Sequence, residues 1–571
     1  MKISLSSSPS LPPFSPLPLS TTLTEQQQAC VQWARNPVGH LIIEAVAGSG
    51  KTYTIMQMII MIVNILHENG VKPQKLIALM AFNAKVRDEL KHRVNQLGLS
   101  AWVEVNTVHG FGFAAYKKAH GPTAPNNFKL SDILAPWLKQ HRLNWELSKP
   151  ITTAVSIAKD SGMGIFFPNN TAEWRRLIAY HDLSWNEEKL PLNLFLTLAS
   201  DLFHKSLLDT SKIDFSDMIY MPLKNNLPFP QFDFVFIDEA QDTNATRREV
   251  ARRMLKQFKP DDTFAEQDGD PPRLHREAWE PLKPIGHLIA VGDRHQAIYG
   301  FTGADNDALD LIKKEFSASE LPLSTCFRCA KSIISHAQKL VSHIQPRCGA
   351  ITGEVILSMP EYNFHENLFA HGTEHSYQTS AILCRKNAPL ISLAFQLVNK
   401  RIPCRIEGKD IGQELIKLCK KLTTSKAILS SGVASSPRQT TDKKFLLSAL
   451  NTHLREQSAK LPAYKLDILS DKISAITSVL QLPHITSLTL FYQTLEQLFS
   501  DYDPNSPPKL TLSSIHKSKG LEWPTVYLLG RNAWMPSPFA TQPWMQEQET
   551  NLTYVAITRA MEKLIEVHVE E

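Results

Sequence analysis

The sequence lacks an apolar run long enough to cross a membrane. Its most apolar stretch, residues 55–66, is 12 residues long and includes Gln57 and Asn64, whereas a membrane-spanning helix needs about 20. The first 22 residues are rich in Ser and Pro, and they have no continuous apolar core, so they do not resemble a signal or transit peptide. We therefore expect no membrane partner, a cytoplasmic location, a buried helix at 55–66 and a disordered tail at 1–22.

Cysteine is also scarce, with seven residues in a chain of 571. An odd number of widely spread cysteines fits a reducing compartment better than a disulfide framework. Cys326 and Cys329 have the spacing of metal ligands, but no second pair follows at the distance of a zinc site. The sequence therefore predicts free thiols. The net charge of +5 permits a nucleic-acid partner without requiring one.

Short apolar strands alternate with helical patterns in two parts of the chain, which predicts parallel sheets in an α/β fold. In the first part we expect strands at 41–45, 76–82, 232–240 and 287–293, with a helical insertion between them. In the second part, after residue 323, we expect strands at 380–385, 509–516 and 525–530, again interrupted by a mostly helical stretch. A chain of this length should form about three or four domains.

A glycine loop follows the first predicted strand and precedes a helix. Its sequence is Ala-Val-Ala-Gly-Ser-Gly-Lys-Thr, and Gly48 and Gly50 allow backbone N–H groups to turn toward phosphate oxygens. Lys51 would contact the β and γ phosphates of ATP, and Thr52 would offer its hydroxyl to Mg²⁺. The loop residues expected to bind ATP are Ala45, Val46, Ala47, Gly48, Ser49, Gly50, Lys51 and Thr52.

Acidic residues follow the apolar run Phe234–Ile237, as expected when a buried strand delivers carboxylates to its carboxyl end. We expect Asp238 to hold Mg²⁺ and Glu239 to orient or deprotonate the attacking water. Together with the glycine loop, these acids predict ATP hydrolysis with ATP and Mg²⁺ as cofactors.

Further segments, taken with these two, resemble the motifs of superfamily 1 helicases of the UvrD/Rep type, and they occur in the same order. The resemblance covers most of the chain and implies two RecA-like motor domains, each with a helical insertion. The segments that carry it are 23–29 (LTEQQQA), 289–304 (IAVGDRHQAIYGFTGA), 323–329 (LSTCFRC), 513–524 (SSIHKSKGLEWP) and 549–560 (ETNLTYVAITRA).

The resemblance implies roles for several residues at the nucleotide. Gln27 would read the adenine edge, Phe327 would stack on the adenine, and Glu522 would belong to the ATP site. Gln296 and Arg328 would lie near the γ phosphate, with Arg559 reaching it from the second motor. The two arginines also have a physical rationale, because an arginine that meets the charge of phosphoryl transfer is worth about 10³ to 10⁵ in rate.

A single strand of nucleic acid is usually held by a basic groove with aromatic platforms. The resemblance places the corresponding candidates on a strand-binding face, in loops just beyond predicted strands. These candidates are Phe82, Lys85, Thr107, His109, Tyr299, Phe301 and His516.

Some positions depart from the family pattern. Thr302 stands where the family usually has arginine, and Arg294 and His295 replace acids. The second insertion, which grips duplex DNA in that family, should be reduced because the region between Arg328 and Lys509 is short.

The domains implied are a first motor at 23–110 and 215–325, its insertion at 111–214, a second motor at 326–421 and 505–571, and its insertion at 422–504. We expect a 3′-to-5′ DNA helicase, associated with the nucleoid, whose partners are single-stranded DNA and duplex junctions. Three alternatives stay open: a translocase that strips proteins from DNA, a nucleotide-gated DNA-binding protein without turnover, and an RNA-directed motor.

Overall fold

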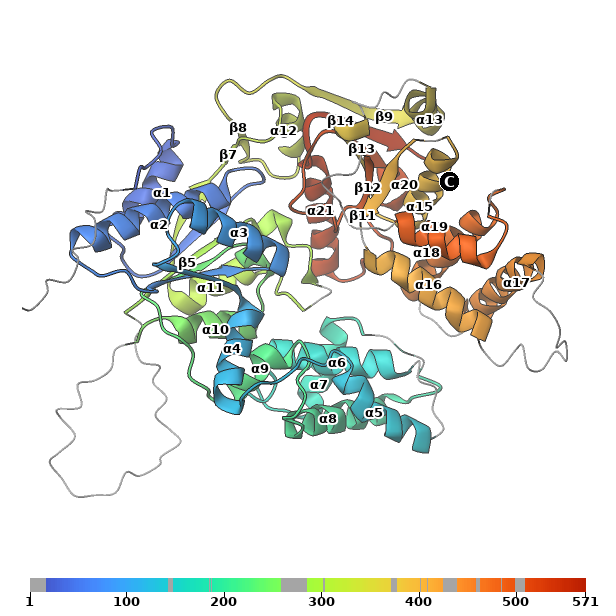
Figure 1. The fold of residues 1–571 in the computed structure, drawn as a ribbon, viewed down its shortest axis with the longest axis horizontal. Helices are drawn as coiled ribbons and strands as arrows, with labels where there is room; N and C mark the ends of the chain where they lie inside the picture. The colour runs from blue at the N-terminus through green and yellow to red at the C-terminus, as the bar shows by residue number, and fades with distance from the viewer. Residues whose placement is uncertain are drawn as a thin grey trace, which may run out of the picture.

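The computed structural model describes residues 17–141, 147–183, 185, 187–257, 285–300, 303–370, 377–400, 402–407, 409–424, 439–458, 463–483, 485–498 and 509–570. Figure 1 shows two α/β bodies side by side, with a group of helices below the first. Within the described ranges, no helix is long and apolar enough to cross a membrane.

The first body is built on a six-stranded sheet in which every pair of neighbouring strands is parallel. Parallel strands place their carboxyl ends, and the loops that follow them, at one edge of the sheet. In spatial order the strands are β3 (Val103–Thr107), β2 (Ile77–Ala81), β4 (Phe234–Ile237), β5 (His287–Gly292), β1 (Leu41–Ala45) and β6 (Ser319–Leu323).

Both faces of this sheet are covered, because alternate side chains of each strand point to opposite faces. On β1, Leu41 and Ile43 belong to one core with the helices of one layer, whereas Ile42 belongs to the core of the other layer. The first layer contains α1 (Glu25–Arg35), α2 (Lys51–Glu68) and α3 (Ala84–Gln96), and the second contains α4 (Val108–His120), α10 (Ala245–Met254) and α11 (Ala308–Phe316).

The predicted helix at 55–66 is confirmed as the middle of α2, and its two polar residues have hydrogen-bond partners. Asn64 Oδ1 accepts a hydrogen bond from Leu17 N at 3.0 Å, and Gln57 Oε1 accepts one from Ser20 N at 2.9 Å. The prediction of a disordered tail is therefore wrong for residues 17–22, which lie against α2. Residues 1–16 lie outside the described part of the chain.

The helices below the first body have a hydrophobic core of their own, centred on Trp174, Phe195 and Phe203. We call them the first helical lobe, and they lie between α4 and β4 along the chain (Figure 1). They are α5 (Lys129–Gln140), α6 (Ser148–Ser161), α7 (Thr171–Tyr180), α8 (Leu192–Leu208) and α9 (Asp217–Lys224).

The second body repeats the plan with another six-stranded parallel sheet. Its strands in spatial order are β11 (Cys404–Glu407), β12 (Leu510–Ser514), β10 (Ser380–Cys384), β13 (Trp523–Leu529), β14 (Ala560–His568) and β9 (Glu354–Pro360). The small strands β7 (Thr325–Cys326) and β8 (Gln345–Pro346) pair with each other. Its helices are α12 (Lys331–Ala337), α13 (Glu361–Ala370), α15 (Ala388–Asn399), α20 (Arg531–Trp534) and α21 (Pro543–Ile557).

A second helical segment follows β11 and packs directly on this sheet. Leu450, Ile476 and Phe491 share one hydrophobic core with Ile382 of β10 and Leu512 of β12. The segment consists of α16 (Lys409–Thr424), α17 (Gln439–Ser458), α18 (Ala463–Leu480) and α19 (Leu488–Leu498).

Candidate functional site

The glycine loop connects β1 to the first turn of α2. Gly48 and Gly50 both have left-handed backbones, with φ of +67° and +79°, and Gly50 is the residue that caps α2. A Cβ on Gly48 would lie 2.6 Å from the Cβ of Arg328 and 3.1 Å from the sulfur of Cys326, so this position has no room for a side chain. The buried hydroxyl of Ser49 has no hydrogen-bond partner within the described structure. A loop of this form at a helix N-terminus suits a phosphate group.

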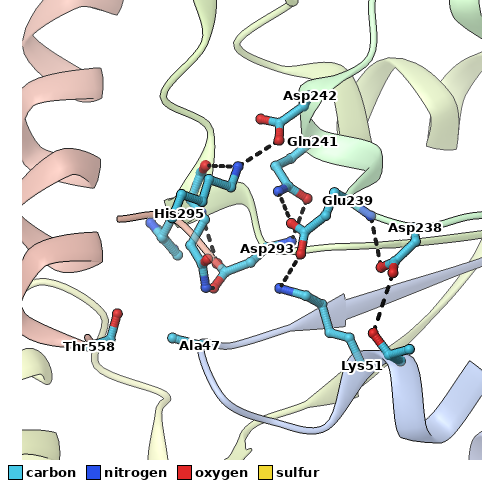
Figure 2. Close-up of polar contacts among 12 residues, drawn as sticks. Ala47, Lys51, Asp238, Glu239, Gln241, Asp242, Asp293, His295 and Thr558 are labelled. Atoms are coloured by element: carbon cyan, nitrogen blue, oxygen red, sulfur yellow. Dashed lines mark hydrogen bonds and ion pairs between the residues drawn. The ribbon is translucent and has the colours of Figure 1, made fainter. Parts of the chain in front are cut away.

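Acidic side chains gather beside this loop at the carboxyl ends of β4 and β5, as Figure 2 shows. Lys51 Nζ lies 3.5 Å from Glu239 Oε1, and Thr52 Oγ1 donates to Asp238 Oδ2 at 3.4 Å. Glu239 itself has a left-handed backbone, with φ of +54°, which costs a residue with a side chain of order 1 kcal/mol or more. The parallel sheet thus brings together the lysine, the hydroxyl and both carboxylates that the sequence singles out.

A hydrogen-bonded chain extends from Glu239 to the next strand. Gln241 Nε2 donates to Glu239 Oε2 at 2.5 Å, and Gln241 Oε1 accepts from Asp293 N at 3.0 Å. Gln296 Nε2 then donates to Asp293 Oδ2 at 2.7 Å. Gln296 is therefore connected to Glu239 through Asp293 and Gln241.

Burial and neighbouring charge set the protonation of these groups. Burial raises the pKa of Asp238, and the adjacent Glu239 charge raises it further. Burial acts in the same direction on Glu239, but Lys51 and Lys519 outweigh it and hold the pKa of Glu239 below its usual range. The pKa of Lys51 is raised, because Glu239, Asp293 and Asp238 outweigh the effect of burial. Glu239 is thus an anion, while Asp238 is a carboxyl group that a cation would stabilise as its anion.

The segment 326–329 brings Phe327 and Arg328 to the glycine loop. Phe327 N donates to Gly48 O at 2.8 Å, and the ring of Phe327 is 39% exposed. Arg328 Nε pairs with Glu522, and its Nη1 donates to Thr558 O at 3.2 Å. These residues therefore form the side of the nucleotide site that faces the second body.

Arg559 is buried behind this surface, with 1% of its area exposed. Its guanidinium donates to Val555 O and Leu521 O, both at 3.0 Å, and to Thr558 Oγ1 at 3.3 Å. Burial, with the nearby Arg328 charge, lowers the pKa of Arg559 to about 9. A cation held mainly by main-chain carbonyls would gain from an approaching phosphate.

Gln27 lies in a capping box at the start of α1. Gln27 N donates to Thr24 Oγ1, and Gln27 Oε1 accepts from Thr24 N at 3.1 Å. Its Nε2 lies 3.3 Å from the place where a Cβ on Gly50 would be. The structure therefore places Gln27 beside the phosphate loop.

Two residues of the second body bind the first and were not predicted individually. Tyr554 Oη accepts a hydrogen bond from Ala47 N of the glycine loop at 3.0 Å. Lys519 Nζ lies 2.6 Å from Asp242 Oδ2 and 2.7 Å from Gln296 O. Both residues fall within the motifs quoted from the sequence, but only the fold shows which side chains of those motifs cross between the bodies.

The predicted strand-binding residues lie close to this cross-body contact. Phe82 stacks on Tyr299 with 5.5 Å between ring centroids, and Lys519 Nζ lies 5.0 Å from the centroid of Tyr299. Tyr299 Oη in turn donates to His516 O at 3.3 Å. Phe82, Tyr299 and His516 are thus neighbours, whereas Phe301 and Thr302 lie outside the described residues.

The other three candidates lie at the starts of helices. Lys85 is exposed in the first turn of α3, and Thr107 caps α4 by accepting from Gly110 N at 2.9 Å. His109 is buried and stacks on Phe215 with 3.8 Å between centroids. Phe215 is 55% exposed, so it offers an aromatic face that the sequence reading missed.

A pocket joins the two groups of residues. Its lining includes Phe82, His109, Glu239, Asp242 and Arg247. The predicted strand-binding residues Phe82 and His109 therefore line the same pocket as the predicted catalytic Glu239.

Arg294, which departs from the family pattern, has a local explanation. It pairs with Glu44 of β1 at 2.5 Å, Asp310 of α11 at 2.8 Å and Glu320 of β6 at 3.4 Å. An arginine at this position is thus matched by three carboxylates around it. All seven cysteines lie within the described residues as thiols outside any disulfide, as the sequence predicts.

Comparisons with known proteins agree with this geometry. The family profile "UvrD/REP helicase N-terminal domain" matches residues 23–317, and the profile "UvrD-like helicase C-terminal domain" matches residues 411–570. The first profile alone spans more than half of the 571 residues.

Curated relatives are similar at low identity. A "Probable DNA helicase II homolog" of Mycoplasma genitalium is 23% identical over 94% of this chain and 83% of its own length. An "ATP-dependent DNA helicase PcrA" of Leuconostoc citreum is 23% identical over 96% of this chain and 82% of its own length. A further "Probable DNA helicase II homolog", from Rickettsia felis, aligns over 57% of this chain and 46% of its own length at 26% identity. The chain belongs to the UvrD/REP helicase family of superfamily 1.

Proposed function

We propose that this family member is an ATP-dependent DNA helicase that moves 3′ to 5′ along single-stranded DNA and opens duplexes, in repair, recombination or replication at the nucleoid. Lys519 is the observation that carries the proposal. Its ammonium group binds Asp242, the carbonyl of Gln296 and the face of Tyr299. One side chain of the second body thus touches both Asp242, in the turn that follows Glu239, and the aromatic stack of the first body.

The catalytic roles follow from the ion pair between Lys51 and Glu239. When a triphosphate enters the loop, its oxygens would compete for Lys51 and draw it away from Glu239. The carboxylate of Glu239 would then lose the charge that lowers its pKa and become a stronger base for the attacking water. Gln296 is linked to Glu239 through Asp293 and Gln241. Contact of Gln296 with the γ phosphate would therefore change the position of residues near the strand-binding face.

The residues present fit a magnesium ion. Asp238 and Thr52 would hold it, as the buried Asp238 is a carboxyl group with no charged donor bonded to it in the described structure. Bound there, Mg²⁺ would neutralise phosphate charge during transfer. The buried Ser49 hydroxyl and the N–H groups of the loop would bind the phosphates.

Arg328 and Arg559 would stabilise the charge that develops on the transferred phosphoryl group. Glu522 would position Arg328, while the exposed ring of Phe327 would stack on the adenine and Gln27 would read its edge. Since both arginines are held by Thr558, a movement of the second body would shift them together.

On the DNA face, Phe82 and Tyr299 would exchange their mutual stacking for stacking on bases, and Lys85 would meet the phosphate backbone. Thr107, His109 and His516 would bind phosphate or sugar. Phe215 adds a platform next to His109. We also propose the division into two motors at 23–110 with 215–325 and at 326–421 with 505–571, which would alternate their grip on the strand.

The test combines ATP turnover with unwinding of tailed duplexes. We expect DNA to stimulate turnover, and Glu239→Gln to reduce the rate about 10² to 10⁴-fold. Lys51→Ala should abolish turnover, while Lys72→Ala, which changes an exposed lysine after α2, should not. Unwinding should occur with a 3′ tail and not with a 5′ tail.

Two outcomes would contradict the proposal. DNA binding without turnover would mean a nucleotide-gated binding protein, and protein displacement without unwinding would mean a stripping translocase. Stimulation by RNA rather than DNA, compared at one stated salt concentration, would assign a different substrate.

A further inference from the structure

Two cysteines flank the proposed adenine-stacking and phosphate-binding residues, in the order Cys326, Phe327, Arg328, Cys329. Both sulfurs are buried, with the cysteines 0% and 3% exposed. Cys329 N donates to the sulfur of Cys326 at 3.4 Å, and the two thiols also share a hydrogen bond. The two cysteines are therefore already in contact in the reduced protein.

The pair is packed against the phosphate loop. The sulfur of Cys326 lies 3.1 Å from where a Cβ on Gly48 would be. Both cysteines share one hydrophobic core with Val46, Ala47 and Tyr554. Any movement of Cys326 is therefore transmitted to the loop that must hold the phosphates.

Cys329 has a second connection, to the arginines. Its thiol donates to Thr558 O at 3.8 Å, and the same carbonyl accepts from Arg328 Nη1 at 3.2 Å. The side chain of Thr558 meets Arg559. The two sulfurs thus lie between the phosphate loop and both proposed arginines.

We propose that Cys326 and Cys329 form a reversible disulfide that switches off ATP hydrolysis. The inference rests on the proposed function, because it assigns a regulatory modification to the same nucleotide site. The oxidant is a small peroxide, which can approach beside the exposed ring of Phe327 and the half-buried Gly48.

The chemistry takes two steps. The thiolate of Cys326 attacks hydrogen peroxide, the O–O bond breaks, and a sulfenic acid and hydroxide form. The thiol of Cys329 then attacks the sulfenic sulfur, the S–S bond forms, and water leaves. The hydroxide takes up the proton that Cys326 releases when it ionises, so the two thiols together lose two electrons and two protons, and peroxide is reduced to two waters. A dithiol reductant reverses the change by thiol–disulfide exchange.

The environment distinguishes the two sulfurs. The hydrogen bond from Cys329, against the effect of burial, lowers the pKa of Cys326 to about 7, which favours the thiolate that reacts. The hydrogen bond and burial raise the pKa of Cys329 well above its usual range. Burial raises the pKa of Cys30, Cys404 and Cys419 to about 12, so these thiols stay protonated.

The disulfide changes the geometry of the site. An S–S bond is about 2.0 Å long, so the sulfurs must approach each other from hydrogen-bonding separation. Cys329 then no longer has the proton that it donates to Thr558, and Cys326 shifts relative to Gly48. Since a misplacement of about 1 Å can cost about 10²-fold in rate, we expect turnover to fall at least about tenfold.

The experiment uses the full chain, carried through hydrogen peroxide treatment and then dithiothreitol. The exposed Cys348 is replaced by Ser to prevent bonds between molecules. Mass spectrometry after alkylation should find a disulfide between Cys326 and Cys329, formed in step with the loss of turnover. Dithiothreitol should restore turnover, and ATP bound beforehand should slow the oxidation. Cys329→Ser, compared with itself before and after peroxide, should lose the reversible disulfide response.

Several results would overturn the inference. These are that peroxide leaves both thiols open to alkylation, that the disulfide forms without loss of turnover, and that Cys329→Ser responds to peroxide as the parent does. The first two measurements need no variant of the pair, so they remain decisive if Cys329→Ser does not fold. If the reduced protein has no ATP turnover, the proposed function is contradicted instead. Mass spectrometry would still show whether the disulfide forms.

Discussion

The two helical segments that interrupt the α/β bodies are held in different ways. The first helical lobe closes its own core around Trp174, whereas the second helical segment buries Phe491 in the core of the second sheet. Most of the lobe therefore packs on itself and joins the core of the first sheet through α9, while the second segment cannot separate from its sheet without exposing that core. An insertion in the sequence is thus not always a separate structural unit.

The lobe also contains a buried group of charges. Lys159 Nζ lies 2.8 Å from Asp214 and 2.6 Å from Asp217, and Lys129 Nζ lies 2.7 Å from Asp217. Two lysines and two aspartates balance each other, which such deep burial requires. These bonds join α5 and α6 to the start of α9, so they close the lobe onto the chain that returns to the first body.

Two large-to-small mutations, one in each helical segment, should distinguish the core of the lobe from the core shared by the second segment and its sheet most strongly. Trp174→Ala in the lobe and Phe491→Ala in the second segment each remove a ring that is at most 1% exposed, at a cost of about 3 to 5 kcal/mol. In Trp174→Ala, hydrogen exchange should speed up across residues 129–224 while β1 and β5 keep their protection. In Phe491→Ala, exchange should also speed up in β10 and β12.

Leu208→Ala serves as the control, because this side chain is exposed at the end of α8 and its loss should change stability by about 0.5 kcal/mol or less. The comparison fails if β10 and β12 stay protected in Phe491→Ala. It also fails if Trp174→Ala exposes the first sheet.

The sequence predicted the interior of each sheet better than its margins. The expected strands at 41–45, 76–82, 232–240 and 287–293 correspond to β1, β2, β4 and β5, which include every interior strand of the first sheet. The edge strands β3, β6, β9 and β11 were missed, because one side of an edge strand faces outward and its sequence is not continuously apolar. β6, for example, is Ser-Glu-Leu-Pro-Leu. The interior strand β14 was missed as well.

The parts of the site that lie on one strand and the turn after it could be predicted from the sequence. The glycine loop and the acids Asp238 and Glu239 are each fixed by a strand and the turn after it, so their sequence patterns are sufficient. Tyr554 and Lys519 act across the cleft between two sheets, and no local pattern states which residue they meet. Phe215 was missed for a similar reason, since its role depends on stacking with His109, which is 106 positions earlier in the sequence.

Acid should lower the stability of the place where the lobe joins α4, which we call the root of the lobe. There His109 of α4 stacks on Phe215. Burial, with the Arg247 charge, lowers the pKa of His109 to about 3, against about 6.5 in an unfolded chain. Between these values the unfolded chain binds more protons, so the stability contribution is complete above about pH 6.5 and is lost as the pH falls.

From pH 7.5 to 5.5, the parent should therefore lose roughly 1 kcal/mol more unfolding free energy than His109→Gln. Urea unfolding at both pH values measures this, and His120→Gln, at the exposed end of the same helix, is the control. Equal losses in the parent and His109→Gln would show that the stacked histidine does not make the lobe sensitive to acid.

The smallest effect concerns the contact between Trp544 of α21 and Tyr180 of the lobe. Trp544 Nε1 donates to Tyr180 O at 3.1 Å, and the two rings stack with 6.0 Å between centroids. Because the pair is partly exposed, we expect it to contribute about 1 kcal/mol.

If the lobe moves as a unit, Trp544→Ala should release it without unfolding it, so exchange should rise at residues 171–183 while the core around Trp174 stays protected. Trp137→Ala, which removes a ring that stacks on His141 within the lobe, should leave exchange at 171–183 unchanged. Equal protection of 171–183 in Trp544→Ala and the parent would mean that the lobe is fixed to the first body by its root alone, and that α21 does not restrain it.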